Sequence, residues 1–266
     1  MRKLALVFGL MASPAAAHEF WIEPLAYQVE SDGRLEAELI NGQHFEGVKI
    51  PYLPRGFENF VLFAGETAQR VQGRPGDNPA MNVEPLGEGL NIAAYQARNA
   101  TVTYENWEKF QNFVTHKDFG DILSAHEARG LPLEDFKELY SRYAKTLFAV
   151  GDGSGSDRRV GLETEIVALT NPYTDDLSEG MRVQVFYRSD ARADTQIEIF
   201  DKAPDGTVEV TTYRTDAEGI GVFPVQAGHS YMVDSVVLRE PSEAEAAETG
   251  AVWESLWANL TFAVPE

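Results

Sequence analysis

Two histidines and a glutamate carry the strongest chemical signal in this sequence. His18 and Glu19 follow the small residues Ala15 to Ala17, and His44 lies in a stretch bounded by glycines, Gly42 to Gly47. A histidine at a chain terminus offers its α-amine as well as its imidazole, and these two nitrogens can chelate one metal ion. Nitrogen ligands suit nickel, cobalt and copper(II), and a carboxylate can add an oxygen ligand. We therefore predict a metal site made from His18, His44 and Glu19.

Residues 1–17 have the layout of a cleaved export signal. Two basic residues precede the apolar run 4–11, and Ala15 and Ala17 occupy the positions that a signal peptidase reads. The apolar run is too short to span a bilayer as a permanent helix. Cleavage after Ala17 makes His18 the first residue, so we expect a soluble periplasmic protein without a membrane span. The alternative is that His18 is only the residue left at the cut, and that His44 is an exposed loop histidine.

The composition is that of an acidic globular protein. Of 266 residues, 44% are hydrophobic and 24% are charged, and the formal net charge is −20. Removing residues 1–17 takes away Arg2 and Lys3 and no acidic residue, which lowers the net charge from −20 to −22. Such a charge argues against nucleic acid as a partner and is compatible with binding small cations. The chain has no cysteine, which excludes disulfides and thiolate metal ligands.

Alternating apolar residues predict a mainly β protein. The alternation is clear over residues 35–39 and 181–187, and Asp-Gly and Glu-Gly pairs mark turns. We predict two antiparallel, immunoglobulin-like β-sandwich domains, an N-terminal one over 18–102 and a C-terminal one over 158–266. The glycine- and serine-rich stretch 151–157 is the joint before the second domain.

A short helical insertion is predicted between the two β domains, over residues 103–150. Apolar residues recur at helical spacing over 107–114 and again over 119–126. Pro132 suits the first turn of a third helix, whose apolar stripe would run from Phe136 to Leu147. Residues 41–47 and 242–250 are predicted to be loops.

Several stretches together resemble one known family. They are His18–Trp21, Gly42–Gly47, Tyr140–Lys145, Gly161–Tyr173, Thr215–Gly219 and Trp253–Phe262. They resemble a periplasmic family of unknown function that is grouped with the periplasmic component of nickel and cobalt uptake systems. The resemblance implies a secreted metal-handling protein with two β domains that serves a transporter. Together with the His18 terminus and the acidic charge, it leads us to predict a non-enzymatic protein that binds nickel or cobalt and assists a membrane uptake transporter. Relatives carry a histidine where this chain has Val236-Val237, which leaves the ligand set open.

Two other functions stay open at this point. A copper ion held by His18 and His44 in a histidine brace would make the protein an oxidative enzyme. A metal-free module that binds carbohydrate or protein would use Trp21, Trp253 and Trp257 as a stacking platform. The remaining histidines favour structural roles: His116 at a helix end, His126 on an apolar helix face and His229 in a turn, in contact with solvent. The sequence contains no Gly-x-Ser-x-Gly, phosphate-loop or His-Glu-x-x-His motif.

Overall fold

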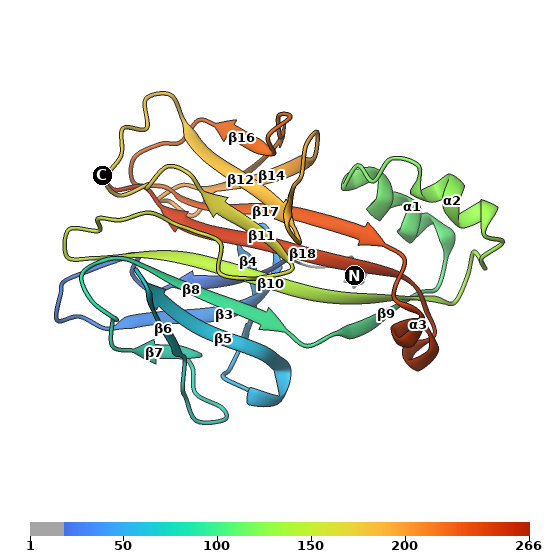
Figure 1. Ribbon diagram of the computed structural model, residues 1–266, viewed down its shortest axis with the longest axis horizontal. Helices are drawn as coiled ribbons and strands as arrows, with labels where there is room; N and C mark the ends of the chain where they lie inside the picture. The colour runs from blue at the N-terminus through green and yellow to red at the C-terminus, as the bar shows by residue number, and fades with distance from the viewer. Residues whose placement is uncertain (1–18) are drawn as a thin grey trace, which may run out of the picture.

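The computed structural model describes residues 19–266, and the predicted signal and His18 lie outside the described residues. The mainly β fold is confirmed (Figure 1). A four-stranded sheet, here called the first sheet, contains β1 (Glu19–Pro24), β3 (Leu35–Gln43), β4 (Glu46–Ile50) and β7 (Met81–Val83). Another four-stranded sheet, the third sheet, contains β11 (Thr164–Ala168), β12 (Met181–Tyr187), β13 (Asp190–Ala191) and β16 (Ile220–Phe223).

A ten-stranded sheet, here called the central sheet, joins strands from both predicted β domains. Its order is β15 (Val208–Arg214), β14 (Gln196–Lys202), β17 (Ser230–Arg239), β18 (Ala251–Ala263), β10 (Phe136–Val150), β8 (Gly89–Ala97), β5 (Phe57–Ala64) and β6 (Thr67–Arg70). The short strands β2 (Gln28–Val29) and β9 (Ala100–Tyr104) pair with β10. Most strand pairs are antiparallel, but β10 pairs in parallel with β18 and with β2.

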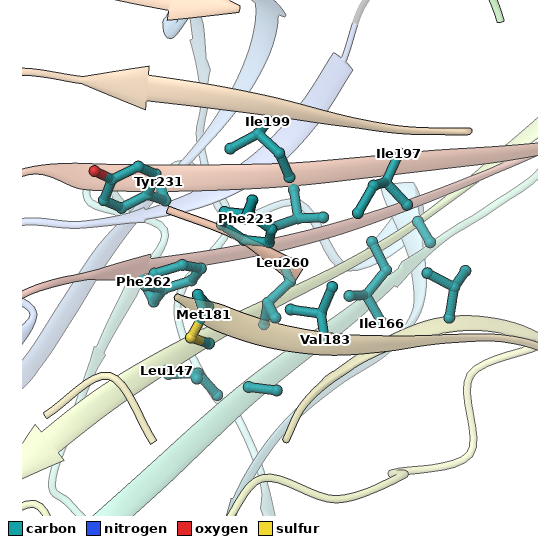
Figure 2. Close-up of a cluster of buried hydrophobic side chains, with 14 of the residues drawn as sticks. Leu147, Ile166, Met181, Val183, Ile197, Ile199, Phe223, Tyr231, Leu260 and Phe262 are labelled. Carbon is teal, nitrogen blue, oxygen red and sulfur yellow. The ribbon is translucent and has the colours of Figure 1, made fainter. Parts of the chain in front are cut away.

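The first and third sheets pack on opposite faces of the central sheet, so the molecule has two main hydrophobic cores. One core lies between the first sheet and β5, β8 and β10. The other lies between the third sheet and β14, β17 and β18, where Val183 meets Ile197 and Leu260 (Figure 2). Adjacent residues of β10 divide between the two cores: Leu147 belongs to the second and Phe148 to the first. This division follows from the pleat, because successive side chains of a strand point to opposite faces.

Two of the three predicted helices are present. They are α1 (Trp107–His116) and α2 (Ile122–Ala128), which lie beside one end of β17 and β18 (Figure 1). The third prediction is wrong, because residues 136–150 form strand β10. This strand is covered on both faces, so its apolar residues do not alternate but recur in pairs, Leu139-Tyr140, Tyr143-Ala144 and Leu147-Phe148, at the spacing of a helix face. A strand that is buried on both faces need not show a period of two, so periodicity alone cannot distinguish it from a buried helix.

Both stretches that were predicted to be loops contain regular structure. Residues 41–47 form the end of β3, a two-residue turn and the start of β4. Residues 243–249 form α3 (Glu243–Thr249), which begins with a capping box between Ser242 and Glu245 and ends at Gly250 in the left-handed conformation. The remaining short helix is a 3-10 turn, Pro54–Gly56. Within residues 19–266, no helix is long and apolar enough to cross a membrane.

The two cores give the first testable prediction. Leu147 and Phe148 are both fully buried, whereas Leu25 is 55% exposed. We expect Leu147→Ala and Phe148→Ala each to lower the free energy of unfolding by roughly 2–5 kcal/mol, because each leaves a cavity in a different core. The control, Leu25→Ala, should change it by less than about 0.5 kcal/mol. Urea unfolding measures all three, and a loss in only one of the two buried variants would contradict the assignment of both cores.

Candidate metal site

A row of polar side chains crosses three adjacent strands of the central sheet. Glu198 on β14 lies directly opposite Asp234 on β17, and Asp234 lies directly opposite Asn259 on β18. All three are almost fully buried. Their sequence neighbours Ile197 and Val233 point into the core under the third sheet, so the row lies on the other face. Two carboxylates directly opposite each other repel, so this row needs a cation nearby.

Strand β1 adds a third carboxylate. Trp21 packs with Phe200 and Met232, which flank the polar row on β14 and β17. The strand is also tied to the central sheet by Thr261, whose hydroxyl donates a 2.6 Å hydrogen bond to the carbonyl oxygen of Ile22. Because Glu19 lies two residues before Trp21, its side chain points to the same face. Glu19 is therefore buried against Glu198 and Asp234.

The three carboxylates converge. One oxygen each of Glu19, Glu198 and Asp234 lies within 4.8 Å of the other two. The cation nearby is Lys117, the residue that caps the C-terminal end of α1. Its Nζ lies 2.8 Å from Asp234 and 3.5 Å from Glu19, and it donates a hydrogen bond to Glu198. The amide of Asn259 donates a 2.8 Å hydrogen bond to the other oxygen of Asp234.

One lysine does not balance the negative charge of three carboxylates, and the pKa values reflect this excess of negative charge. Burial raises the pKa of Glu19 to about 7, although Lys117 opposes the shift. Burial also raises the pKa of Asp234. Burial opposes ionisation of Glu198 too, but its hydrogen bond with His116 and the charge of Lys117 lower its pKa overall. Burial lowers the pKa of Lys117, but the surrounding carboxylates outweigh it and raise that pKa above its usual value. The site therefore holds a proton or a further cation readily.

His116 lies at the edge of this cluster. Its Nε2 is 2.7 Å from Glu198, and its side chain is 64% exposed. The hydrogen bond with Glu198 raises the pKa of this histidine. The sequence had suggested a structural role at the helix end. The structure instead places an imidazole nitrogen beside Glu198, one of the three carboxylates, where it can serve as a metal ligand from the solvent side.

The predicted ligands occupy different positions relative to the cluster. Glu19 is part of it. His18, the residue next to Glu19, lies outside the described residues. His44 is exposed at the tip of the β3–β4 hairpin, a two-residue turn in which His44 and Phe45 have φ values of 52° and 57°. The ring of His44 lies 6.2 Å from that of Phe200, and no contact with the carboxylates is present among the described residues.

The hairpin nevertheless lies beside the start of β1. Gly42 pairs with Glu19 on one side and with Gly47 on the other. A Cβ on Gly42 would lie 2.0 Å from the carbonyl oxygen of Glu46, so only glycine fits there. Phe45 turns inward and packs against Trp21. The hairpin thus covers β1 at the residue that carries the cluster's first carboxylate.

The tryptophans of the stacking-platform alternative are buried. Trp21, Trp253 and Trp257 are each at most 2% exposed, so these rings offer no surface for a carbohydrate. His126 is also buried, as expected, and its ring accepts a 3.0 Å hydrogen bond from the Trp253 indole. His229 lies 2.6 Å from Asp201 and is partly buried, so the expected solvent contact is incomplete.

Sequence reasoning missed Glu198, Asp234 and Lys117. The chain has 42 acidic residues, and no spacing distinguishes Glu198 and Asp234 from the others. One signal was available for the two carboxylates. Both lie inside mainly apolar strands, where a charged residue is rarely buried without a partner. Which residue would be the partner depends on strand register and on the helix end, and neither follows from local sequence.

Comparison with known proteins gives a family but no function. A family model described as a domain of unknown function (DUF4198) matches residues 15–238. No curated protein matches the sequence. Among solved structures, the chain is similar to the tetra-tandem repeat in the extending region of a large adhesion protein, with 9% identity and a TM-score of 0.22. That match covers 92% of this chain and 49% of the other, and a TM-score this low supports no inference about fold or function.

The pKa of Glu19 gives a prediction for stability. Between pH 4.5 and about 7 the folded chain keeps a proton on Glu19 that the unfolded chain has released. The stability from this proton is therefore complete below pH 4.5 and is lost as the pH rises through 7. We expect Glu19→Gln to reduce the fall in unfolding free energy between pH 5 and pH 8 by an amount on the order of 1–3 kcal/mol.

Urea unfolding of the metal-free protein at several pH values measures this effect. Burial raises the pKa of Glu138 to about 7 as well, and this side chain accepts hydrogen bonds from Tyr104 and Ser255, which are not part of the carboxylate cluster. Glu138→Gln is therefore a matched control that removes a separate part of the same pH dependence. An unchanged slope in Glu19→Gln would contradict the raised pKa.

Proposed function

The chain belongs to the DUF4198 family, and we propose that it is an exported protein that binds a divalent transition metal, nickel or cobalt, for a membrane uptake transporter. The proposed site is the cluster of Glu19, Glu198 and Asp234 together with the terminal nitrogens of His18. The observation that carries the proposal is the convergence of three buried carboxylates, one of which, Glu19, directly follows His18.

The donor set supports an ion of this class. Carboxylates alone suit magnesium or calcium, whereas imidazole nitrogen shifts preference toward nickel, cobalt, copper and zinc. His116 brings one such nitrogen to the edge of the cluster. In the proposal, cleavage after Ala17 adds the α-amine and imidazole of His18. His44 remains a proposed additional ligand, since its hairpin pairs with β1 at Glu19.

The site also attracts cations and has a side that faces solvent. The three carboxylates carry more charge than Lys117 and His116 can neutralise, so a further cation is attracted. The ligands come from β1, β14 and β17, and only β1 lies outside the central sheet. A protein that transfers its metal to a transporter needs an accessible entry, and the exposed side chain of His116 marks the solvent side. In this proposal the protein binds the metal and transfers it, without chemistry on the metal.

Calorimetric titration with nickel chloride tests the site. We expect a chain that begins at His18 to bind nickel at least tenfold more tightly than one with a single extra alanine before His18, because the extra residue blocks chelation by the α-amine. We expect Asp234→Asn to weaken binding at least tenfold, since it removes a buried charged ligand. His44→Ala should weaken binding by a smaller factor, on the order of a few fold.

The control variant is Glu138→Gln, which changes a buried carboxylate that contacts none of the three ligands. Its nickel affinity should equal that of the unaltered chain. If Asp234→Asn binds nickel as tightly as the unaltered chain does, the carboxylate cluster is not the metal site. Equal affinity with and without the extra alanine would remove His18 from it.

A further inference from the structure

We propose, on the basis of the proposed function, that Lys117 is a built-in competitor for the metal. In the metal-free protein its ammonium occupies the place among the carboxylates that the metal takes. Metal binding then displaces Lys117 and loosens the end of α1. The site would thus couple the presence of metal to the position of the helical hairpin α1–α2.

The geometry makes the two cations mutually exclusive. A metal ion bonded to three carboxylate oxygens at about 2.1 Å holds those oxygens no more than about 4.2 Å apart. The three oxygens here already lie within 4.8 Å of one another, so a small contraction is enough. The ion would have to lie among them, where the Nζ of Lys117 now contacts Asp234, Glu198 and Glu19. Two cations cannot share that space.

The ammonium of Lys117 and the helix α1 contact the same aromatic ring. Its Nζ lies 4.9 Å from the centre of the Trp257 ring, and Phe113 of α1 stacks on the same ring at 5.6 Å. Lys117 caps the helix, with its backbone N–H bonded to the carbonyl oxygen of Phe113. Loss of the ion pairs with the carboxylates therefore removes the charged contact that holds this helix end over Trp257.

Apart from the contact between His116 and Glu198, the other polar contacts of the helix end are more exposed. Gln196 donates a 2.8 Å hydrogen bond to the carbonyl oxygen of His116, and Asp118 pairs with Arg214 at the surface. Exposed pairs of this kind contribute little to stability. The buried ion pairs of Lys117 are thus the main polar attachment of the helix end. A metal that replaces these ion pairs alters the position of the α1–α2 hairpin, and a partner protein could bind one position in preference to the other.

Chemical acylation of lysines in the full-length mature protein tests the proposal directly. Lys117 is 8% exposed and its charge is stabilised by three carboxylates, so an amine-acylating reagent should modify it slowly without metal. We expect saturating nickel chloride to raise its modification rate at least fivefold, as read by mass spectrometry of the peptide. Lys109, a partly exposed residue on the same helix, should not change.

Lys145 provides a control for unfolding. It is 1% exposed and paired with Asp157 and Glu165, away from the cluster. Its modification should stay slow with nickel. If Lys145 and Lys117 become reactive together, the protein has unfolded and the displacement of Lys117 is contradicted.

Two substitutions at Lys117 give an independent readout. Lys117→Met removes the competing charge and keeps much of the side-chain length, so nickel affinity should rise at least tenfold. Lys117→Arg keeps a competing cation, so affinity should stay equal to or below that of the unaltered chain. A merely structural lysine would give the opposite order, because Lys117→Met would then damage the site most. If Lys117→Met does not fold, the acylation measurement on the unaltered chain still decides.

The two proposals fail in different ways. In one outcome the unaltered chain binds nickel, but Lys117 stays unreactive and Lys117→Met binds nickel no more tightly. The proposal that Lys117 competes with the metal is then wrong, and the proposed metal site stands. If neither the unaltered chain nor Lys117→Met binds nickel or cobalt, the proposed function itself is wrong.

Discussion

The ion pairs between Lys117 and three buried carboxylates hold together parts of the chain that are far apart in sequence. Glu19 comes from β1, Lys117 from the end of α1, and Glu198 and Asp234 from the central sheet. Buried charges are costly unless they are paired, so each of these segments constrains the others. The first sheet and the helical hairpin are thereby fixed to the same face of the central sheet. Any cation that enters this cluster acts on all of these segments at once.

The central sheet explains why the cluster can be buried at all. Its face under the third sheet is covered by Val183, Phe223 and their neighbours, which form an apolar core. The other face meets β1 along β17 and β18, where the polar row replaces apolar residues. Apolar packing of the third sheet behind β14, β17 and β18, together with Trp21, Phe200 and Met232 on the near face, thus offsets the cost of burying charge at the polar row.

Much of this fold follows from the sequence, and most of the site does not. Alternation identified strands such as β3 and β12, and helical spacing identified α1 and α2, because each has one buried face. Strand β10 was mistaken for a helix, since both of its faces are buried. Glu19 was found beside His18 in the sequence. Glu198 and Asp234 were not, because their meeting depends on pairing between β14 and β17. Lys117 depends in addition on where α1 ends.

The position of β18 between β17 and β10 has a consequence for folding. Strand β18, residues 251–263, lies between β17 and β10 near the middle of the central sheet, although it is the last strand of the chain. Until it arrives, β10 and β17 both present open edges, and Asp234 has no Asn259 to bond. Contacts this distant in sequence form slowly. During synthesis from the N-terminal end, the central sheet therefore stays incomplete until β18 is inserted. Its open edges favour aggregation until then.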